Sequence, residues 1–403
     1  MAFAGLAGGC AAVAGLLLAG RMAGPPLSAG PMLQNATPDG FTLVWWQNGG
    51  GEDELRVRGG TAPDAVFPAI RIGARYEARA RGLAPGTAYR YEILRRGANP
   101  EPDRLAAGQA RSAKLPGEPF SFLVFSDSGG GRRPQLRLAQ AMDQYPSDLI
   151  LHCGDLIHGN GPRGDYAGRF FLPNQSLLRK IPFYPVLGNH DLREDNGRGF
   201  LDQFSLPTNG PPAVPPGRCY WFDYGDARFV GIDSTLDRKT LSDAVAPWLR
   251  DILRPADRRW KFAYFHHSPW EGGERPANEK ICAALVPAIE ESGTDVVFGG
   301  HNHLYQRTRP MRAGRIAPSN GTLYVTSGAG GRSLDMETYG KSPCLAAFDD
   351  SQFSFTWIRV SGGRVEIEQI GEHDDVLDRV VLSRPMAGPN RILRCARLEC
   401  NGT

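Results

Sequence analysis

The chain has almost no charge surplus of either sign. Its 403 residues include 46 Lys and Arg against 43 Asp and Glu, a net charge of +3. This balance indicates neither a nucleic-acid-binding nor a membrane-binding surface, so we expect no nucleic-acid partner. Cysteine is scarce too, and no two of the seven cysteines have the spacing of a zinc site. Cys395 and Cys400 would close a small disulfide loop only in an exported protein.

Long apolar runs are missing except at the start of the chain. Residues 2–20 carry no charge and are followed by Arg21, which predicts a secretion signal or membrane anchor over residues 1–24. The protein would then be secreted, periplasmic or surface-anchored, with possible membrane attachment at this end. Basic residues that normally precede such a segment are missing, so a disordered N-terminus is the alternative reading. Cys10 only hints at a lipidation site.

The length predicts two domains, and the 50 Gly and 32 Pro favour many strands and turns. Residues 25–114 read as short alternating strands, for example residues 41–46 and 89–94. Between these, the segment from Gly82 to Tyr89 resembles the tyrosine corner of fibronectin type III sandwiches. We therefore predict an all-β sandwich without chemistry of its own, followed by a Pro-containing linker.

From residue 115 to residue 385 the pattern changes to strands alternating with helices, which predicts a layered α/β domain. We expect a helix at residues 135–144 and a tail at 386–403. Strands are expected at residues 120–125, 148–153, 183–187, 229–232, 261–265 and 294–298, and on the far side at 323–326, 353–360 and 365–370. Loops after the carboxyl ends of such strands are where these folds bind ligands.

Residue types that bind metals follow five of these strands directly. Seven of the eight histidines lie in or beside the strand ends, and only His373 lies elsewhere. The five segments are Ser126-Asp127-Ser128-Gly129, Gly154-Asp155-Leu156-Ile157-His158, Gly188-Asn189-His190-Asp191, His266-His267-Ser268-Pro269-Trp270 and Gly299-Gly300-His301-Asn302-His303. Each segment alone would be an ordinary turn or helix cap. Five in this order predict one shared metal site.

Carboxylate, amide and imidazole ligands suit Zn, Fe and Mn, and no thiolate takes part. A carboxylate can bridge two cations, and a pair of such cations can activate water near neutral pH and clamp a phosphoryl oxygen. Glycines before Asp155, Asn189 and His301 would let the backbone turn sharply and leave room for phosphate.

The five segments resemble the signature of the calcineurin-like metallophosphoesterases. The run from Gly300 to Arg307 and the preceding sandwich look most like purple acid phosphatases. The resemblance covers residues 31–384. It implies a fibronectin type III-like sandwich followed by a four-layer α/β/β/α metallophosphoesterase domain with two divalent or mixed-valence metal ions (Fe, Zn or Mn).

The resemblance also implies a role for each residue. Asp127, Asp155 and His303 would bind the first ion, and Asp155 would bridge to a second ion held by Asn189, His267 and His301. His190 would be the acid outside the metal shell, oriented by Asp191. His266 competes with His267 for one position. The ligand falls two residues before a Pro, which selects His267, and strand alternation would then turn His266 away.

One departure from the family concerns the fourth ligand of the first ion. Purple acid phosphatases have Tyr three residues after the bridging Asp, where this chain has His158. Related phosphoesterases instead have His two residues after the first Asp, where this chain has Gly129. Either His158 is the ligand or water fills the position. Without a phenolate we expect a colourless protein with divalent metal and a less acidic optimum.

The expected activity is hydrolysis of small phosphate monoesters by a metal-bound hydroxide. Arg132, Arg133 and Arg307 are candidates to bind the substrate phosphate, with solvated surface arginines as the alternative. A phosphodiesterase or nucleotidase with the same site is the nearest rival. A non-catalytic surface module is more distant, and attachment through the sandwich would be compatible with catalysis.

Overall fold

The computed structural model describes residues 27–60, 64–97, 101–159, 165–193, 195–270, 278–336 and 342–384. The predicted signal or anchor, the C-terminal tail, Cys10, Cys395 and Cys400 lie outside these residues. Cys153, Cys219, Cys282 and Cys344 are free thiols. Among the helices described, none is both long and apolar enough to cross a bilayer.

The N-terminal part of the chain is an all-β sandwich, as predicted. Its core lies between two four-stranded sheets, with Leu43, Trp45 and Tyr76 from the first sheet and Ile93 from the second. The first sheet has the order β1 (Ala29–Thr37), β2 (Gly40–Trp46), β6 (Arg75–Ala80) and β5 (Ile70–Ile72), and the second the order β4 (Ala65–Pro68), β3 (Glu52–Arg58), β7 (Ala88–Arg96) and β8 (Asp103–Arg111).

The predicted tyrosine corner is present at the start of β7. The hydroxyl of Tyr89 accepts a hydrogen bond from the backbone amide of Ala84 at 2.8 Å. Tyr89 is buried in the sandwich core, so this bond fixes the turn that enters β7.

Two further sheets pack face to face in the second part of the chain. The first has the order β11 (Phe183–Pro185), β10 (Leu149–His152), β9 (Phe120–Phe125), β21 (Ser354–Ser361), β22 (Arg364–Gly371) and β23 (Val376–Ser383). The second has the order β12 (Tyr220–Tyr224), β13 (Ala227–Gly231), β14 (Trp260–His267), β15 (Val296–Gly300), β19 (Leu323–Ser327), β16 (Tyr305–Thr308) and β20 (Leu345–Asp349). Phe122 of the first sheet meets Phe229 and Phe262 of the second, with ring centroids 5.2 and 5.4 Å apart. β17 (Met311–Arg312) and β18 (Arg315–Ile316) form a separate two-stranded sheet.

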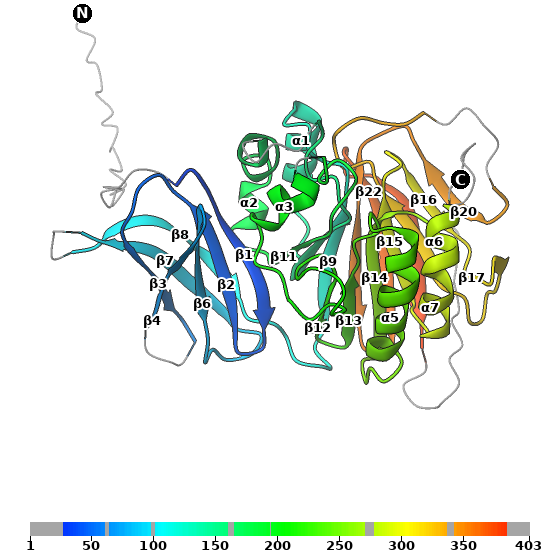
Figure 1. The fold of residues 1–403 in the computed structure, drawn as a ribbon, viewed down its shortest axis with the longest axis horizontal. Coiled ribbons are helices and arrows are strands. Elements are labelled where there is room, and N and C mark those ends of the chain that lie inside the picture. Colours follow the sequence, from blue (N-terminus) through cyan, green and yellow to red (C-terminus); the bar gives the residue numbers. More distant parts are fainter. Residues whose placement is uncertain are drawn as a thin grey trace, which may run out of the picture.

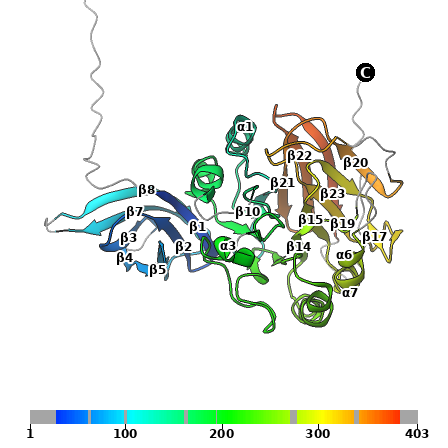
Figure 2. The same ribbon diagram turned by 45° about the horizontal axis from the view of Figure 1, so that its top comes forward.

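Helices cover the outer faces of both sheets, which gives the expected four layers (Figures 1 and 2). The first sheet packs on α1 (Arg133–Met142), η1 (Ala167–Phe171) and α2 (Gln175–Leu178), followed in the chain by η2 (Asp195–Gly197) and α3 (Arg198–Leu201). The second packs on η3 (Leu241–Val245), α5 (Ala246–Leu253), α6 (Glu279–Ala284) and α7 (Val286–Glu291), with α4 (Arg238–Thr240) preceding them. Strands β9, β10 and β11 run parallel, as do β13, β14, β15 and β19, so within each sheet their carboxyl ends meet at one edge.

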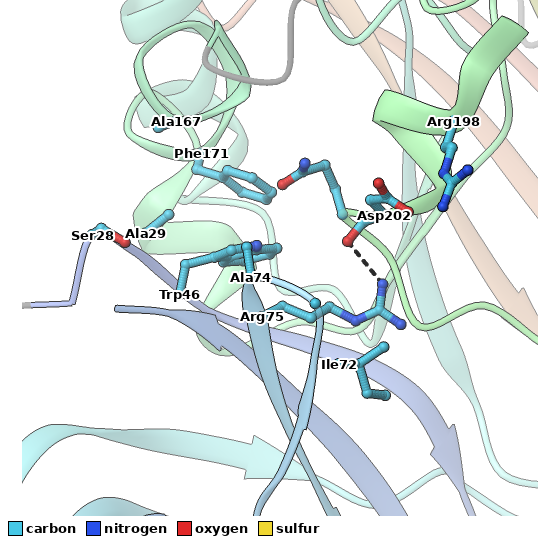
Figure 3. Close-up of a pocket in the computed structure, with 12 residues that line it drawn as sticks. Ser28, Ala29, Trp46, Ile72, Ala74, Arg75, Ala167, Phe171, Arg198 and Asp202 are labelled. Atoms are coloured by element: carbon cyan, nitrogen blue, oxygen red, sulfur yellow. Dashed lines mark hydrogen bonds between the residues drawn. The ribbon is translucent and has the colours of Figure 1, made fainter. Parts of the chain in front are cut away.

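The sandwich packs against the helical face of the first sheet (Figure 1). Trp46 contacts Phe171 with ring centroids 4.5 Å apart, and Arg75 donates to the carbonyl of Asp202 at 2.9 Å. Figure 3 shows both pairs at the wall of a cavity of about 660 Å³ between the two parts. Tyr91 adds a hydrogen bond to the carbonyl of Arg179 at 2.7 Å. These contacts tie the sandwich to the elements that follow β10.

Candidate metal centre

Three of the predicted metal ligands occupy unusual backbone conformations at the strand ends. Asp127 follows β9, Asp155 follows β10 and His301 follows β15. Their φ angles are 57°, 53° and 73°, all in the left-handed region that non-glycine residues seldom adopt. Such strain costs about 1–3 kcal/mol per residue and is characteristic of functional sites. The sharp turn aims each side chain across the edge of the sheet.

Two glycines at this edge have no room for a side chain. A Cβ at Gly188 would overlap the carboxylate of Asp155, and a Cβ at Gly300 would overlap Ser126 Oγ and lie 2.6 Å from Asp127 Oδ2. The predicted sharp turn is visible at Gly154, where φ is 90°. The glycines before Asn189 and His301 therefore serve close approach of the ligand loops.

Asp127, His158 and His303 form a first cluster, with one ligand atom from each within 4.8 Å of the others. Asp127 Oδ2 accepts hydrogen bonds from Ser126 Oγ at 2.6 Å and from the amide of His301 at 2.9 Å. Asp127 Oδ1 has no hydrogen-bond partner among the described residues and lies 3.5 Å from His303 Nε2.

His158 gives the strongest indication that this first cluster binds a metal ion. Its ring is buried, and neither ring nitrogen has a hydrogen-bond partner within the described part of the chain. A buried imidazole without partners forfeits the hydrogen bonds it would make in water. Beside an equally unpartnered carboxylate oxygen, this is the arrangement that a cation would satisfy.

Asp155 lies at the centre of the site. Its Oδ1 accepts from the amide of His190 at 2.8 Å. Its Oδ2 lies 3.4 Å from His266 Nε2, 3.7 Å from His158 Nε2 and 3.9 Å from His190 Nε2. One oxygen thus faces imidazoles from the loop after β10, from the loop after β11 and from the end of β14, which suits a carboxylate that bridges two cations.

A second cluster contains His266, His267 and His301, again with ligand atoms within 4.8 Å of one another. Asn189 Oδ1 lies 3.0 Å from His266 Nε2, so the amide belongs to the same group. His267 is held by Ser234, whose Oγ lies 2.9 Å from His267 Nδ1 and accepts from its backbone amide at 3.0 Å.

The expectation that His266 points away from the site is wrong. Phe262 and Tyr264 pack in the core between the sheets, and His266 continues on that face of β14 toward the loops of the first sheet. The pairing with β15 becomes irregular between Tyr264 and His267, and the ring of His267 still contacts that of His301, with centroids 4.7 Å apart. Both histidines therefore reach the centre.

Asp191 does not orient His190, and this prediction is corrected. Its Oδ2 accepts from the amides of Gly188 and Leu156 at 3.0 and 3.3 Å, and its Oδ1 accepts from the hydroxyl of Tyr166 at 3.2 Å. Because Gly188 and Leu156 lie in different ligand loops, the buried carboxyl joins these loops. His190 Nδ1 instead faces the carbonyl of Gly159 at 3.4 Å.

The three candidate arginines separate into two kinds. Arg132 and Arg133 are exposed at the start of α1, just after the Asp127 loop, and neither has an ion-pair partner among the described residues. Arg307 is buried and binds the carboxylate of Asp378 through Nε at 2.5 Å and Nη2 at 3.0 Å. The prediction that Arg307 binds substrate is therefore corrected: its guanidinium joins β16 to β23.

Protonation in the site is set by burial and by the imidazole–carboxylate contacts. Burial lowers the pKa of His158 to about 4, and that of His267 to about 2 with help from the neighbouring histidines. These rings are neutral near pH 7 and offer lone pairs. Burial alone would raise the pKa of Asp127 and Asp155, but their histidine neighbours hold it below its usual range.

Despite burial, the neighbouring carboxylates raise the pKa of His266 to about 9 and also raise that of His303. Without a metal ion, the site therefore combines ionised carboxylates with neutral rings at His158 and His267 and with proton-holding rings at His266 and His303.

Several residues that hold the site histidines in place were not predicted from the sequence. Ser333 Oγ lies 2.7 Å from His303 Nδ1, and Asp335 accepts from the amide of His303 at 3.0 Å. Nothing in their loop indicated this. Ser234 gave a usable signal, because it comes just after the predicted strand at residues 229–232, as the other site residues follow theirs.

Comparison with known proteins agrees with this geometry. Residues 120–305 match the calcineurin-like phosphoesterase family, so the chain contains a calcineurin-like phosphoesterase domain. Its relatives include purple acid phosphatases. Purple acid phosphatase 15 of Arabidopsis thaliana is 27% identical over 306 residues, which cover 66% of this chain and 55% of that protein. A nucleotide pyrophosphatase/phosphodiesterase of Hordeum vulgare is 24% identical over 283 residues, 57% of this chain and 72% of that protein.

The fold also matches a solved structure. The purple acid phosphatase PPD1 from yellow lupin seeds superposes with a TM-score of 0.77 at 18% identity, over 89% of this chain and 74% of that one. This likeness shows the shared fold of sandwich and phosphoesterase domain. The chain spans only a little over half the length of several curated relatives.

Proposed function

We propose that this protein hydrolyses small phosphate monoesters at a binuclear metal centre. One observation carries the proposal. Asp155 Oδ2 lies between the two clusters, 3.7 Å from His158 Nε2 of the first and 3.4 Å from His266 Nε2 of the second, and the buried Asp127 Oδ1 and His158 nitrogens have no hydrogen-bond partner among the described residues. A structural polar cluster would pair such atoms internally. Here the unpaired atoms converge on common points, as ligands do.

The residues present fit two metal ions. Asp127, Asp155, His158 and His303 would hold the first, and Asp155, Asn189, His267 and His301 the second. Two bound ions would lower the pKa of a water molecule to near neutrality and neutralise charge on the phosphoryl oxygens. With imidazole in place of a phenolate, the first position favours divalent Zn, Mn or Fe, and the protein should be colourless.

His190 is positioned to act as the acid. Its side chain is 22% exposed, whereas that of His158 is 5% exposed and that of His266 is fully buried. A carbonyl can only accept, so a hydrogen bond to Gly159 places the hydrogen of a neutral ring on Nδ1 and leaves Nε2 on the side of Asp155. Nε2 can therefore hold a second proton that is delivered to the leaving oxygen. Arg132 and Arg133, exposed beside the Asp127 loop, would bind the remaining phosphate oxygens.

A phosphodiesterase or nucleotidase is the second candidate function. It is favoured by the barley relative, whose name states nucleotide pyrophosphatase/phosphodiesterase activity. A diester carries one negative charge fewer and needs less cationic contact, so the exposed Arg132 and Arg133 favour the monoester.

The first test is metal content together with hydrolysis of p-nitrophenyl phosphate and bis-p-nitrophenyl phosphate. Asp155→Asn should lower turnover at least 100-fold, since losing an outer partner of a metal ligand alone costs about 10–100-fold. Asp243→Asn, which removes an exposed carboxylate in the π-helical element η3, is the matched control and should keep full activity. Unchanged turnover in Asp155→Asn, or a wild type without metal after loading with Zn, Mn or Fe, would favour a binding module.

Export or anchoring stays a prediction, because residues 1–24 lie outside the described residues. Cell fractionation of the full chain and of a chain beginning at residue 25 tests it: only the full chain should leave the cytoplasm or sediment with membranes.

A further inference from the structure

We propose that His266 binds the second metal ion directly, an assignment that rests on the binuclear centre proposed above. The ring is fully buried at the end of β14. Its Nε2 lies 3.0 Å from Asn189 Oδ1 and 3.4 Å from Asp155 Oδ2. These oxygens belong to two side chains already assigned to the second ion.

The other ring nitrogen shows which atom would bind a metal ion. His266 Nδ1 lies 2.9 Å from the carbonyl oxygen of Cys153, which can only accept, so Nδ1 carries a hydrogen. Nε2 therefore faces Asn189 Oδ1 and Asp155 Oδ2, two oxygens that bear lone pairs. Without a metal ion, a second proton on Nε2 would be shared with these oxygens. A bound cation would take the place of that proton, because all three atoms would then direct lone pairs at it.

The spacing fits a shared ion. Nitrogen and oxygen ligands lie about 2.0–2.2 Å from zinc. Two such ligands at right angles around one ion are about 3 Å apart. The separations of 3.0 and 3.4 Å match this arrangement.

The hydrogen bond to Cys153 also has the form expected around a metal ligand. Ligating histidines usually donate their second N–H to a carbonyl or carboxylate, which fixes the ring and its tautomer. Cys153 ends the same segment that supplies Asp155, with only Gly154 between them. One loop thus provides the bridging carboxylate and orients the imidazole that faces it.

This assignment makes the second position rich in imidazole, with His266, His267 and His301 around one ion. The first position has two carboxylates and two imidazoles. Imidazole suits Zn and Fe, whereas carboxylate suits Mn. We therefore expect the second position to select Zn or Fe over Mn more strongly than the first.

The experiment compares wild type, His266→Ala and His266→Gln after loading with Zn²⁺ and dialysis. Wild type should retain two ions per chain, and each variant one. The dissociation constant of the weaker site should rise at least 100-fold in the variants, because loss of a residue that only supports a ligand already costs about 10–100-fold in metal affinity. His152→Gln is the control, because His152 is equally buried but hydrogen-bonds Ser128 Oγ at 3.0 Å outside both clusters. It should retain both ions.

X-ray absorption of the zinc-loaded proteins separates ligation from positioning. Without His266, the proposed ligands would supply four imidazoles to the two ions, from His158, His267, His301 and His303. Wild type should therefore show five imidazoles per two ions, and His266→Gln should show fewer. Circular dichroism in chelator checks that each variant is folded. A His266→Gln protein that keeps two ions at wild-type affinity would overturn this inference alone. A wild type that binds no ion would overturn the binuclear centre itself.

Discussion

The backbone amide of His158 donates to the carbonyl oxygen of Gly129, with 3.4 Å between nitrogen and oxygen. These are the two positions at which purple acid phosphatases and other calcineurin-like phosphoesterases carry their alternative fourth ligand. A Cβ at Gly129 would overlap the Cα of Ile157 and the carbonyl oxygen of Leu156. The missing side chain at residue 129 thus lets the 156–158 segment close over it and places the imidazole of His158 beside Asp127.

Gly129→Ala should disturb the first metal position. The added methyl group meets backbone atoms, so the segment carrying His158 must move. We expect a loss of stability of about 1–3 kcal/mol, as for other overpacked sites, and weaker binding of one of the two ions. Urea unfolding and metal titration measure these effects. Gly168→Ala, where a Cβ meets nothing within 4 Å, is the control. Equal behaviour of the two variants would contradict the packing argument.

His158→Tyr should restore a phenolate to the site. Wild-type protein loaded with iron should lack an intense visible charge-transfer band, because its ligands are carboxylates, amide and imidazoles. The variant should gain such a band if residue 158 contacts the first ion. Visible absorption before and after iron loading decides this. A variant that binds iron without colour would show that residue 158 is not a ligand. A purple wild type would contradict the expected ligand set, because it would show that a phenolate from another residue binds the iron.

Asp191→Asn should change how stability depends on pH. Burial and the charge of Asp155 raise the pKa of Asp191 to about 7 from its ordinary value of 3.8. The folded metal-free protein therefore keeps a proton that the unfolded chain loses, and stability falls as the pH rises from about 4 to 7. An Asn cannot titrate, yet its oxygen can still accept from Gly188 and Leu156. Urea midpoints between pH 4 and 8 should fall less for the variant. Parallel profiles would refute the assignment.

Arg307→Gln should lower stability without changing KM, whereas Arg132→Ala should raise KM without changing stability. Removing one partner of the buried Arg307–Asp378 pair leaves a buried charge unpaired, which costs about 3–5 kcal/mol. The KM of the Arg307→Gln protein for a phosphate monoester should stay unchanged. Arg132 is exposed, so its loss should leave stability within about 0.5 kcal/mol, while KM for a monoester rises. Unfolding curves and steady-state kinetics of both proteins test the pair. A raised KM in Arg307→Gln with normal stability would return Arg307 to the substrate site.

The class of site was predictable from local sequence. Asp127, Asp155, Asn189 and His301 each follow a strand, and parallel strands bring such residues to one edge of a sheet whatever the loops between them do. The tyrosine corner at Tyr89 is similarly local, since its partner Ala84 is only five residues away. Periodicity and strand-end chemistry were enough to predict these features.

The roles that depend on distant partners could be read only from the folded chain. Arg307 is committed to Asp378, 71 residues further along the chain, and His266 faces a carbonyl 113 residues before it. Asp191 joins the loops of Gly188 and Leu156 instead of orienting its neighbour His190. Which residue types gather at the sheet edge could be predicted along the chain, because that follows from strand order. Which partner each side chain takes depended on the packing of two sheets against each other, and no spacing along the chain encodes that.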